Sequence, residues 1–314
     1  MTADQRHLLK NVILYILKDF SGGSDYIKLY KILYFAHKEQ LATIGIPLVN
    51  DNFKAWRLGP VPSFAGSVIK HLETGDPLTD DMLPFKKAIK VRRNKLVSAL
   101  EPPEYECIPE YSRFLIDKHI AKCKYQTADA LSQKSHDAAW IEAYYGNDNL
   151  HDGQSSLRPE LIAAAGDAPD SIIYCVKAFS RKSPKFYNER DSVKVWKSLT
   201  NAAASLHNLS LLPQGWDGDD ADKVKTDAAL NCRMLIASRL ARIDMIDDIY
   251  PTPMGNICID WMNNGNKASI EVGESRMAFY YTSADRKEIF DSPVMDFNDD
   301  ACRLLYKYIH KCDA

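Results

Sequence analysis

Two histidines lie close to carboxylates in the sequence: His37 precedes Glu39, and His136 precedes Asp137. If folding brought them together, such groups could transfer protons or bind a metal. The chain lacks the H-E-x-x-H spacing, a nucleophile elbow and a third ligand fixed by a local motif. We therefore expect hydrogen-bonded structural histidines, with no catalytic residue, cofactor or metal. An enzyme that uses both histidines is the remaining alternative.

An acidic run follows Trp216. Four aspartates, Asp217, Asp219, Asp220 and Asp222, lie within six residues, a density typical of calcium loops. The order differs from an EF-hand loop, because the glycine is misplaced and no glutamate occupies the twelfth position. We therefore expect these carboxylates to cap a helix that begins near Asp222, where they bind free amides and favour the helix dipole.

The charge distribution argues against a nucleic-acid partner. The 314 residues carry 40 Lys and Arg against 42 Asp and Glu, a net charge of −2. One basic cluster occurs, and we interpret it as a solvated loop surface, with a role in partner binding as the alternative. It comprises Lys86, Lys87, Lys90, Arg92, Arg93 and Lys95.

Composition and length predict a cytoplasmic protein of two domains. The chain is 46% hydrophobic and 26% charged, and a domain has roughly 150 residues. It contains neither a membrane-spanning apolar run nor a secretory signal. Seven scattered cysteines without a C-x-x-C pair are typical of reduced thiols. We therefore expect no membrane partner.

Hydrophobic spacing predicts short helices in the N-terminal half. The helix over residues 26–43 is apolar nearly all round and should be central, capped by Ser24 or Asp25 and ended by Gly45. Loops and short elements are expected over residues 74–110. Further helices are predicted over residues 4–20, 63–72 with Ser63 as cap, 112–123, and 127–145 as two helices with Ser135 as a cap between them.

A polar stretch at residues 146–156 predicts a domain boundary. We expect a first domain over residues 1–150, a linker or uncertain segment over 151–185, and a second domain over 186–314. The fold class is α+β: a mostly helical N-terminal domain, and a C-terminal domain of helices packed on a three-stranded antiparallel meander. Its helices are predicted at 191–208, 222–243 and 297–311, and its strands at 255–262, 267–273 and 276–282.

Three segments together resemble a known family. They are the run from Lys28 to Leu41, the pieces Phe53 to Trp56 and Leu58 to Val61, and the pattern of Leu131, Ser132, Ser135, His136 and Trp140. In order and spacing they are similar to the Panacea (SocA-like, GepA-like) antitoxin domain, over residues 5 to about 146. Two departures are Ser135, where the family commonly has Thr, and the sequence after Val61.

The resemblance implies a mostly helical protein-binding domain that neutralises a cognate toxin protein. It also implies a protease or chaperone as a further partner, and we add homodimerisation as an expectation. The alternative is a self-restrained defence protein, in which the C-terminal domain is an effector that the Panacea-like domain holds in cis.

The motif residues are also explained by packing. We expect Gly59 and Pro60 to form a turn that aims Trp56 inward, and Trp140 to anchor the core. The family-motif and partner-binding candidates are Lys28, Lys31, Tyr34, His37, Trp56, Gly59, Pro60, His136 and Trp140.

Overall fold

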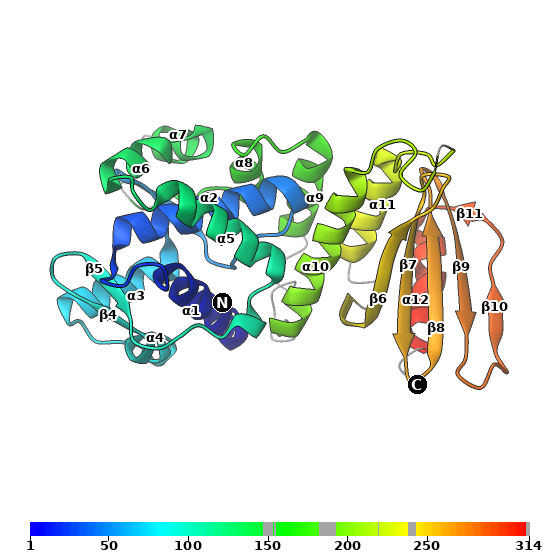
Figure 1. The fold of residues 1–314 in the computed structure, drawn as a ribbon, viewed down its shortest axis with the longest axis horizontal. Helices are drawn as coiled ribbons and strands as arrows, with labels where there is room; N and C mark the ends of the chain where they lie inside the picture. Colours follow the sequence, from blue (N-terminus) through cyan, green and yellow to red (C-terminus); the bar gives the residue numbers. More distant parts are fainter. Residues whose placement is uncertain (147–152, 154, 182–192, 219, 238–242, 312–314) are drawn as a thin grey trace. The chain divides into compact units, whose positions relative to one another are not determined.

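A computed structural model describes residues 1–146, 153, 155–181, 193–218, 220–237 and 243–311. The chain divides into two compact units, Met1–Lys197 and Ser198–Ala314 (Figure 1). Within the described residues both units combine helices with antiparallel strands, which confirms the α+β class.

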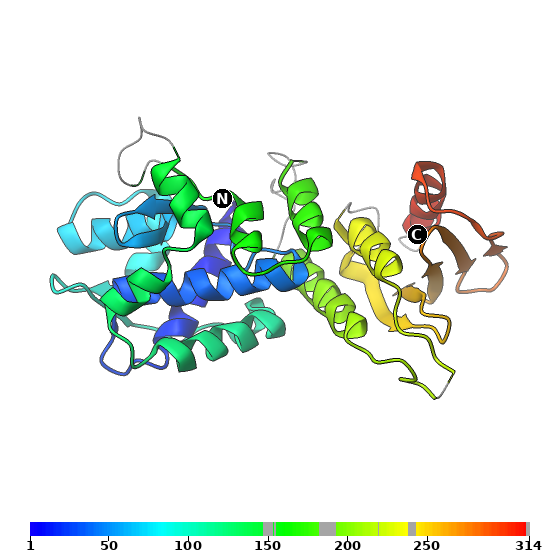
Figure 2. The same ribbon diagram turned by 90° about the horizontal axis from the view of Figure 1, so that it is seen from above.

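Helix α2 (Tyr26–Ile44) is the centre of the first unit, as its apolar circumference predicts. The Asp25 carboxylate caps it by accepting from the Ile27 amide, and Gly45 ends it at a φ of 74°. The helices that pack around it include α1 (Ala3–Leu17), α5 (Glu110–Cys123), α6 (Ala128–Lys134), α8 (Pro159–Ala164) and α9 (Asp170–Arg181) (Figure 2).

A hairpin of β2 (Phe53–Trp56) and β3 (Gly59–Pro62) leads into α3 (Ser63–Thr74). The prediction that Ser63 caps α3 is wrong, because Ser63 is the first helical residue. Instead, the carboxylate of Asp51 accepts hydrogen bonds from the amides of Phe64 and Ala65 at 2.9–3.1 Å. A cap supplied from twelve residues before the helix leaves no local sequence signal.

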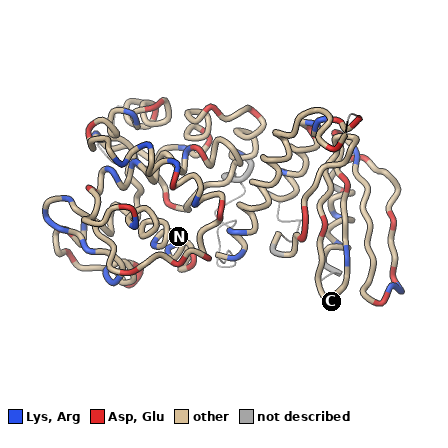
Figure 3. Tube along the Cα trace, viewed as in Figure 1, with Lys and Arg blue, Asp and Glu red and all other residues tan. Residues whose placement is uncertain are grey.

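The expected short elements occupy residues 80–107. They are the 3-10 turn Asp80–Met82, α4 (Leu83–Ala88), β4 (Ile89–Val91), β5 (Leu96–Ala99) and the 3-10 turn Tyr105–Cys107. Strand β5 pairs with both β4 and β1 (Ser24–Asp25). The basic cluster therefore runs from α4 through β4 to the β4–β5 turn, and Figure 3 shows Lys and Arg along this hairpin.

The two short helices predicted next are α6 (Ala128–Lys134) and α7 (Ala138–Tyr145). Ser135 is the C-cap residue of α6, and Asp137 is the N-cap of α7. After them, the described part of the polar stretch pairs with β2: the Gly153 amide donates to Ala55 O and the Ala55 amide to Ser155 O. The described residues of this segment therefore extend the β2–β3 hairpin by pairing with β2.

The second unit is a sheet with packed helices. Strand order is β10 (Ile289–Asp291), β9 (Arg276–Thr282), β8 (Asn266–Val272), β7 (Ile257–Asn263) and β6 (Ile246–Pro251), with β11 (Met295–Asp296) also on β9. Helix α11 (Thr226–Ala237) packs on β7 and β8, and α12 (Asp299–Lys311) on β8 and β9. Helix α10 is Val193–Ser210.

The predicted three-stranded meander is present as β7–β9, but the prediction of three strands is wrong. Ile257, Ile259 and Trp261 share a buried face as expected. The missed strands are edges: β6 contains two aspartates and a register shift, and β10 and β11 have three and two residues. Such short, polar edge strands are specified by pairing with β7 and β9 rather than by their own pattern.

The acidic run does not cap a helix, so that prediction is also wrong. Helix α11 begins at Thr226, beyond the run, and the 3-10 turn Ile243–Met245 precedes β6. The Asp222 amide donates to Pro253 O, and the Trp216 indole donates to Asp222 O. Asp219 and residues 238–242 lie outside the described residues. In the described ranges no group of three His, Cys, Asp or Glu side chains is placed to hold a metal ion.

Other general features concern the described residues alone. None of their helices is both long and apolar enough to cross a membrane. Six cysteines are buried, and Cys312 lies outside the described part. Basic and acidic residues are both spread over each of the two units (Figure 3).

Candidate functional site

The family-motif residues meet where the β2–β3 turn contacts the junction of α6 and α7. The Trp140 indole donates to Trp56 O at 2.9 Å, and the Ser132 hydroxyl donates to Leu58 O at 2.7 Å. Trp140 is buried, which confirms it as a core anchor. These bonds satisfy turn carbonyls and fix the hairpin to the helices.

Lys31 reaches the same turn from α2. Its side chain is 1% exposed, and Nζ donates to Pro60 O at 3.0 Å. Burial lowers the pKa of Lys31 to about 7, because desolvation disfavours the ammonium form. A buried lysine of this kind holds Pro60 in place and is costly when charged.

Gly59 allows this close approach. Its φ is +93°, and a Cβ built there would lie 2.2 Å from Ser135 Oγ and 2.7 Å from Lys31 Nζ. Ser135 is fully buried, and its hydroxyl donates to Ser132 O at 2.7 Å. A side chain at this position would meet both a strained backbone and occupied space.

Asp137 joins α2 to α7. Its carboxylate accepts from the Tyr34 hydroxyl at 2.9 Å, from Lys38 Nζ at 2.8 Å and from the Trp140 amide at 3.2 Å. Burial, together with the charge of Asp137, raises the pKa of Tyr34, whose side chain is fully buried. Asp137 is therefore a helix cap and an ion-pair partner.

His136 has a structural environment. Its ring stacks on Trp140 with centroids 3.7 Å apart, and it shares a hydrogen bond with the Arg57 backbone. Burial and the nearby Lys31 lower the pKa of His136, so the neutral form is favoured. Within the described residues its Nε2 has no hydrogen-bond partner.

His37 lies in different surroundings, against Phe53 with ring centroids 4.9 Å apart. Contrary to the expectation of a hydrogen-bonded histidine, its Nδ1 is buried without a partner among the described residues. Burial lowers the pKa of His37 to about 3. Glu39, the carboxylate considered for it, instead pairs with Lys118 and His119 on α5.

The other two candidates take separate roles. Lys28 Nζ donates to Lys124 O at 2.8 Å, at the C-terminal end of α5. Trp56 is 42% exposed, so the prediction that it points inward is wrong. Alternation explains this: Phe53 and Ala55 of β2 are buried, which places Trp56 on the opposite face.

A groove of about 580 Å³ opens beside the exposed turn. Trp56, Arg57 and Leu58 lie at its edge, and Tyr26, Tyr30, Val61 and Ile69 are among its apolar lining. Among its described lining residues, the charged side chains are Lys54, Arg57, Lys70, Lys95 and Glu73, together with the buried Lys31. Sequence reasoning missed most of these cations, because they come from four separate segments: α2, the β2–β3 hairpin, α3 and the β4–β5 turn. The alternation of β2 was the available signal for Trp56.

Comparison with known proteins agrees with the motif. Residues 29–141 match the family model described as "Antitoxin SocA-like, Panacea domain". The protein "Antitoxin SocA" of Caulobacter vibrioides (strain NA1000 / CB15N) is 37% identical over 65 residues, which cover 19% of this chain and 35% of that protein. No solved structure matches this chain.

The matched segment runs from α2 to α7 and includes Lys31, Tyr34, Gly59, Pro60, His136 and Trp140. It is shorter than the expected resemblance over residues 5–146, and it leaves the second unit without a family. Residues 29–141 of this chain are a SocA-like Panacea domain whose motif residues hold a hairpin, a central helix and a helical corner together.

Proposed function

We propose that this chain is the antitoxin of a bacterial or phage toxin–antitoxin system and neutralises its toxin by direct binding. The Panacea domain and the distant relative named as an antitoxin support the class of function. The observation that carries the binding surface is the exposed Trp56-Arg57-Leu58 turn, held rigidly by bonds from Trp140 and Ser132.

The turn has the composition of a binding hot spot. Tryptophan and arginine are the residues that contribute most at protein interfaces, and Trp56 and Leu58 are 42% and 40% exposed. A fixed backbone lowers the entropy lost when the toxin binds. The proposed interface is therefore this turn together with the adjoining groove.

The groove specifies the kind of surface that the toxin presents. Four exposed or half-buried cations, Lys54, Arg57, Lys70 and Lys95, against one carboxylate among the described lining residues favour an acidic partner surface with an apolar residue that fits between the rings. The interface requires complementary charge and shape but no reaction, so we assign no catalytic residue to this function.

The test is growth rescue in bacteria. The full chain is co-expressed with the product of a neighbouring gene that is toxic by itself, and complex formation is measured by co-purification. Arg57→Glu and Leu58→Asp should each weaken the complex at least about tenfold and abolish rescue, because they reverse the charge or add one at a buried contact.

Two variants control for general effects. Lys122→Glu reverses an exposed charge on α5, and Leu100→Asp adds a charge at an exposed leucine. Both should rescue growth like the unmodified chain, and circular dichroism should show the same fold for all four. Rescue by Arg57→Glu and Leu58→Asp would place the interface elsewhere, and absence of any toxic neighbour that the chain silences would refute the proposed function.

A further inference from the structure

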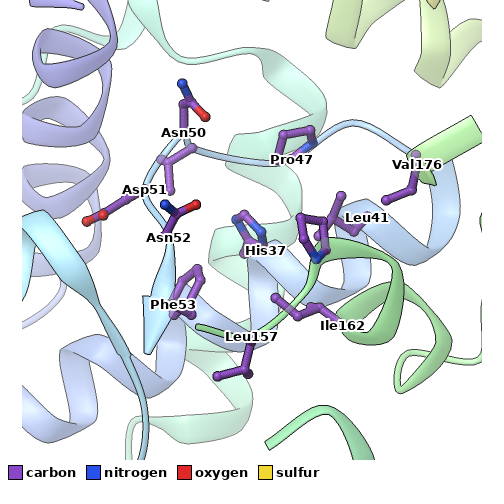
Figure 4. A pocket seen from close by; sticks show the side chains of 13 residues that line it. His37, Leu41, Pro47, Asn50, Asp51, Asn52, Phe53, Leu157, Ile162 and Val176 are labelled. Atoms are coloured by element: carbon purple, nitrogen blue, oxygen red, sulfur yellow. The ribbon is translucent and has the colours of Figure 1, made fainter. Parts of the chain in front are cut away.

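A cavity of about 300 Å³ is lined by α2, the loop after it, and the segment around α8. Figure 4 shows the His37 ring pointing into it, with Asn52 and Leu157 close by. The volume is at the small end of the range for small-molecule sites in proteins. The proposed toxin interface uses none of these residues.

His37 is the unexplained group in this cavity. Its side chain is 4% exposed, and Nδ1 has no hydrogen-bond partner among the described residues. The low pKa caused by burial keeps the ring neutral at physiological pH. A neutral imidazole offers one donor and one acceptor, and because Nδ1 is closed off from solvent, a ligand in the cavity would pair with Nε2.

The charges around the cavity select against an ionic ligand. No lysine or arginine is among its described lining residues. The carboxylate of Asp51 accepts from the Phe64 and Ala65 amides, and in Figure 4 it points away from His37. A phosphate or carboxylate group would therefore find no counter-charge, and a cation would find a carboxylate already occupied.

The remaining lining residues favour a planar polar molecule. Asn50 and Asn52 carry amides, each with two donors and an acceptor, that no described residue engages. Leu41, Ile162 and Val176 supply apolar walls. An apolar pocket with a few polar groups on one side is the usual form of a small-ligand site.

We propose that this cavity binds a small uncharged heteroaromatic molecule with an amide edge, of the size of a free nucleobase. The imidazole of His37 and the amide of Asn52 contact the polar edge of the ring, and the aliphatic side chains cover its faces. This inference is independent of the antitoxin function, because its residues and its test involve no toxin.

The experiment is titration of the full chain with uracil, cytosine and adenine, followed by calorimetry and by the ¹⁵N chemical shifts of the His37 ring. We expect saturable binding of at least one base and a shift of the His37 nitrogen signals. Orotate, a uracil that carries a carboxylate, and benzene, which lacks polar atoms, should both bind at least about tenfold more weakly.

Variants separate a ligand site from a structural histidine. Asn52→Ala removes an exposed side-chain amide and should weaken binding about fivefold to tenfold. His37→Phe should abolish the polar contact, whereas Asn94→Ala, an exposed asparagine in the β4–β5 turn, should bind normally. The proposal fails if no base binds at millimolar concentration, which would leave only water in the cavity. It also fails if orotate binds equally well, or if Asn52→Ala and His37→Phe both bind unchanged.

Discussion

Gly59 and Gly75 provide a matched test at the scale of single residues. Both have positive φ, +93° and +81°, but a Cβ at Gly59 would meet Ser135 and Lys31, whereas a Cβ at Gly75 would meet nothing within 4 Å. Each Gly→Ala change should cost about 1 kcal/mol in backbone strain. Gly59→Ala should cost about 1–3 kcal/mol more through the clash. Urea unfolding of both variants measures the difference, and equal losses would contradict the packing argument.

The low pKa of the buried Lys31 should make the stability of the chain depend on pH. Its pKa is about 7 in the folded chain against the ordinary 10.5, so the unfolded chain binds more protons between these values. Stability from this group therefore rises as pH increases from 7 toward 10.5, and is lost as pH falls to 7. Lys31→Met removes this dependence, so its stability relative to the unmodified chain should fall by about 3 kcal/mol from pH 7 to 9.5.

The measurement for Lys31→Met is the free energy of unfolding in urea at both pH values. Taking the difference between variant and unmodified chain cancels titrations that both share. Lys122→Met, at an exposed lysine, should show no such change. A constant difference for Lys31→Met would mean that Lys31 keeps an ordinary pKa in the folded chain.

At the scale of elements, Asp137 decides how α7 is attached to α2. Asp137→Ala removes a helix cap and leaves the buried Tyr34 hydroxyl and Lys38 without their partner. We expect a loss of about 2–3 kcal/mol. Asp129→Ala, an exposed acid in the first turn of α6, should lose less than about 1 kcal/mol. Thermal unfolding compares the two variants, and similar losses would show that α7 is held by packing alone.

At the scale of the whole molecule, the first unit extends past the polar stretch. Residues 155–157 bond to β2, and α8 and α9 pack on α2. We therefore expect a fragment of residues 1–181 to unfold cooperatively, and a fragment of residues 1–150 to have a lower urea midpoint, because it exposes part of α2. Circular dichroism measures both transitions. Equal midpoints would show that α8 and α9 contribute nothing to this unit.

A second prediction about the whole molecule distinguishes an antitoxin from a self-restrained effector. If the chain acts only by binding a separate toxin, residues 193–314 expressed alone should not slow bacterial growth. Growth inhibition by this fragment, relieved by co-expression of residues 1–181, would instead support restraint in cis. A frameshifted copy of the fragment controls for the burden of expression.

Local patterns in the sequence determined many of the elements and both caps of α2. The spacing of apolar residues predicted α2 and its central place, glycine at residue 45 predicted its end, and alternation predicted β7, β8 and β9. The motif residues predicted the Panacea domain, because their order and spacing along the chain can be recognised without knowing the fold. These features depend on residues near one another in the chain, where period and capping chemistry act.

Tertiary structure alone decided how those residues are used. The bond from Lys31 to Pro60 spans 29 residues, and that from Trp140 to Trp56 spans 84. The cap on α3 likewise comes from Asp51, twelve residues before that helix, and the edge strand β6 is specified by its pairing with β7. The hydrogen-bond partner of a buried polar atom depends on which residues folding brings beside that atom. The net charge of a groove likewise depends on which residues folding brings together around it. No local pattern encodes that neighbour, and only the tertiary structure supplies it.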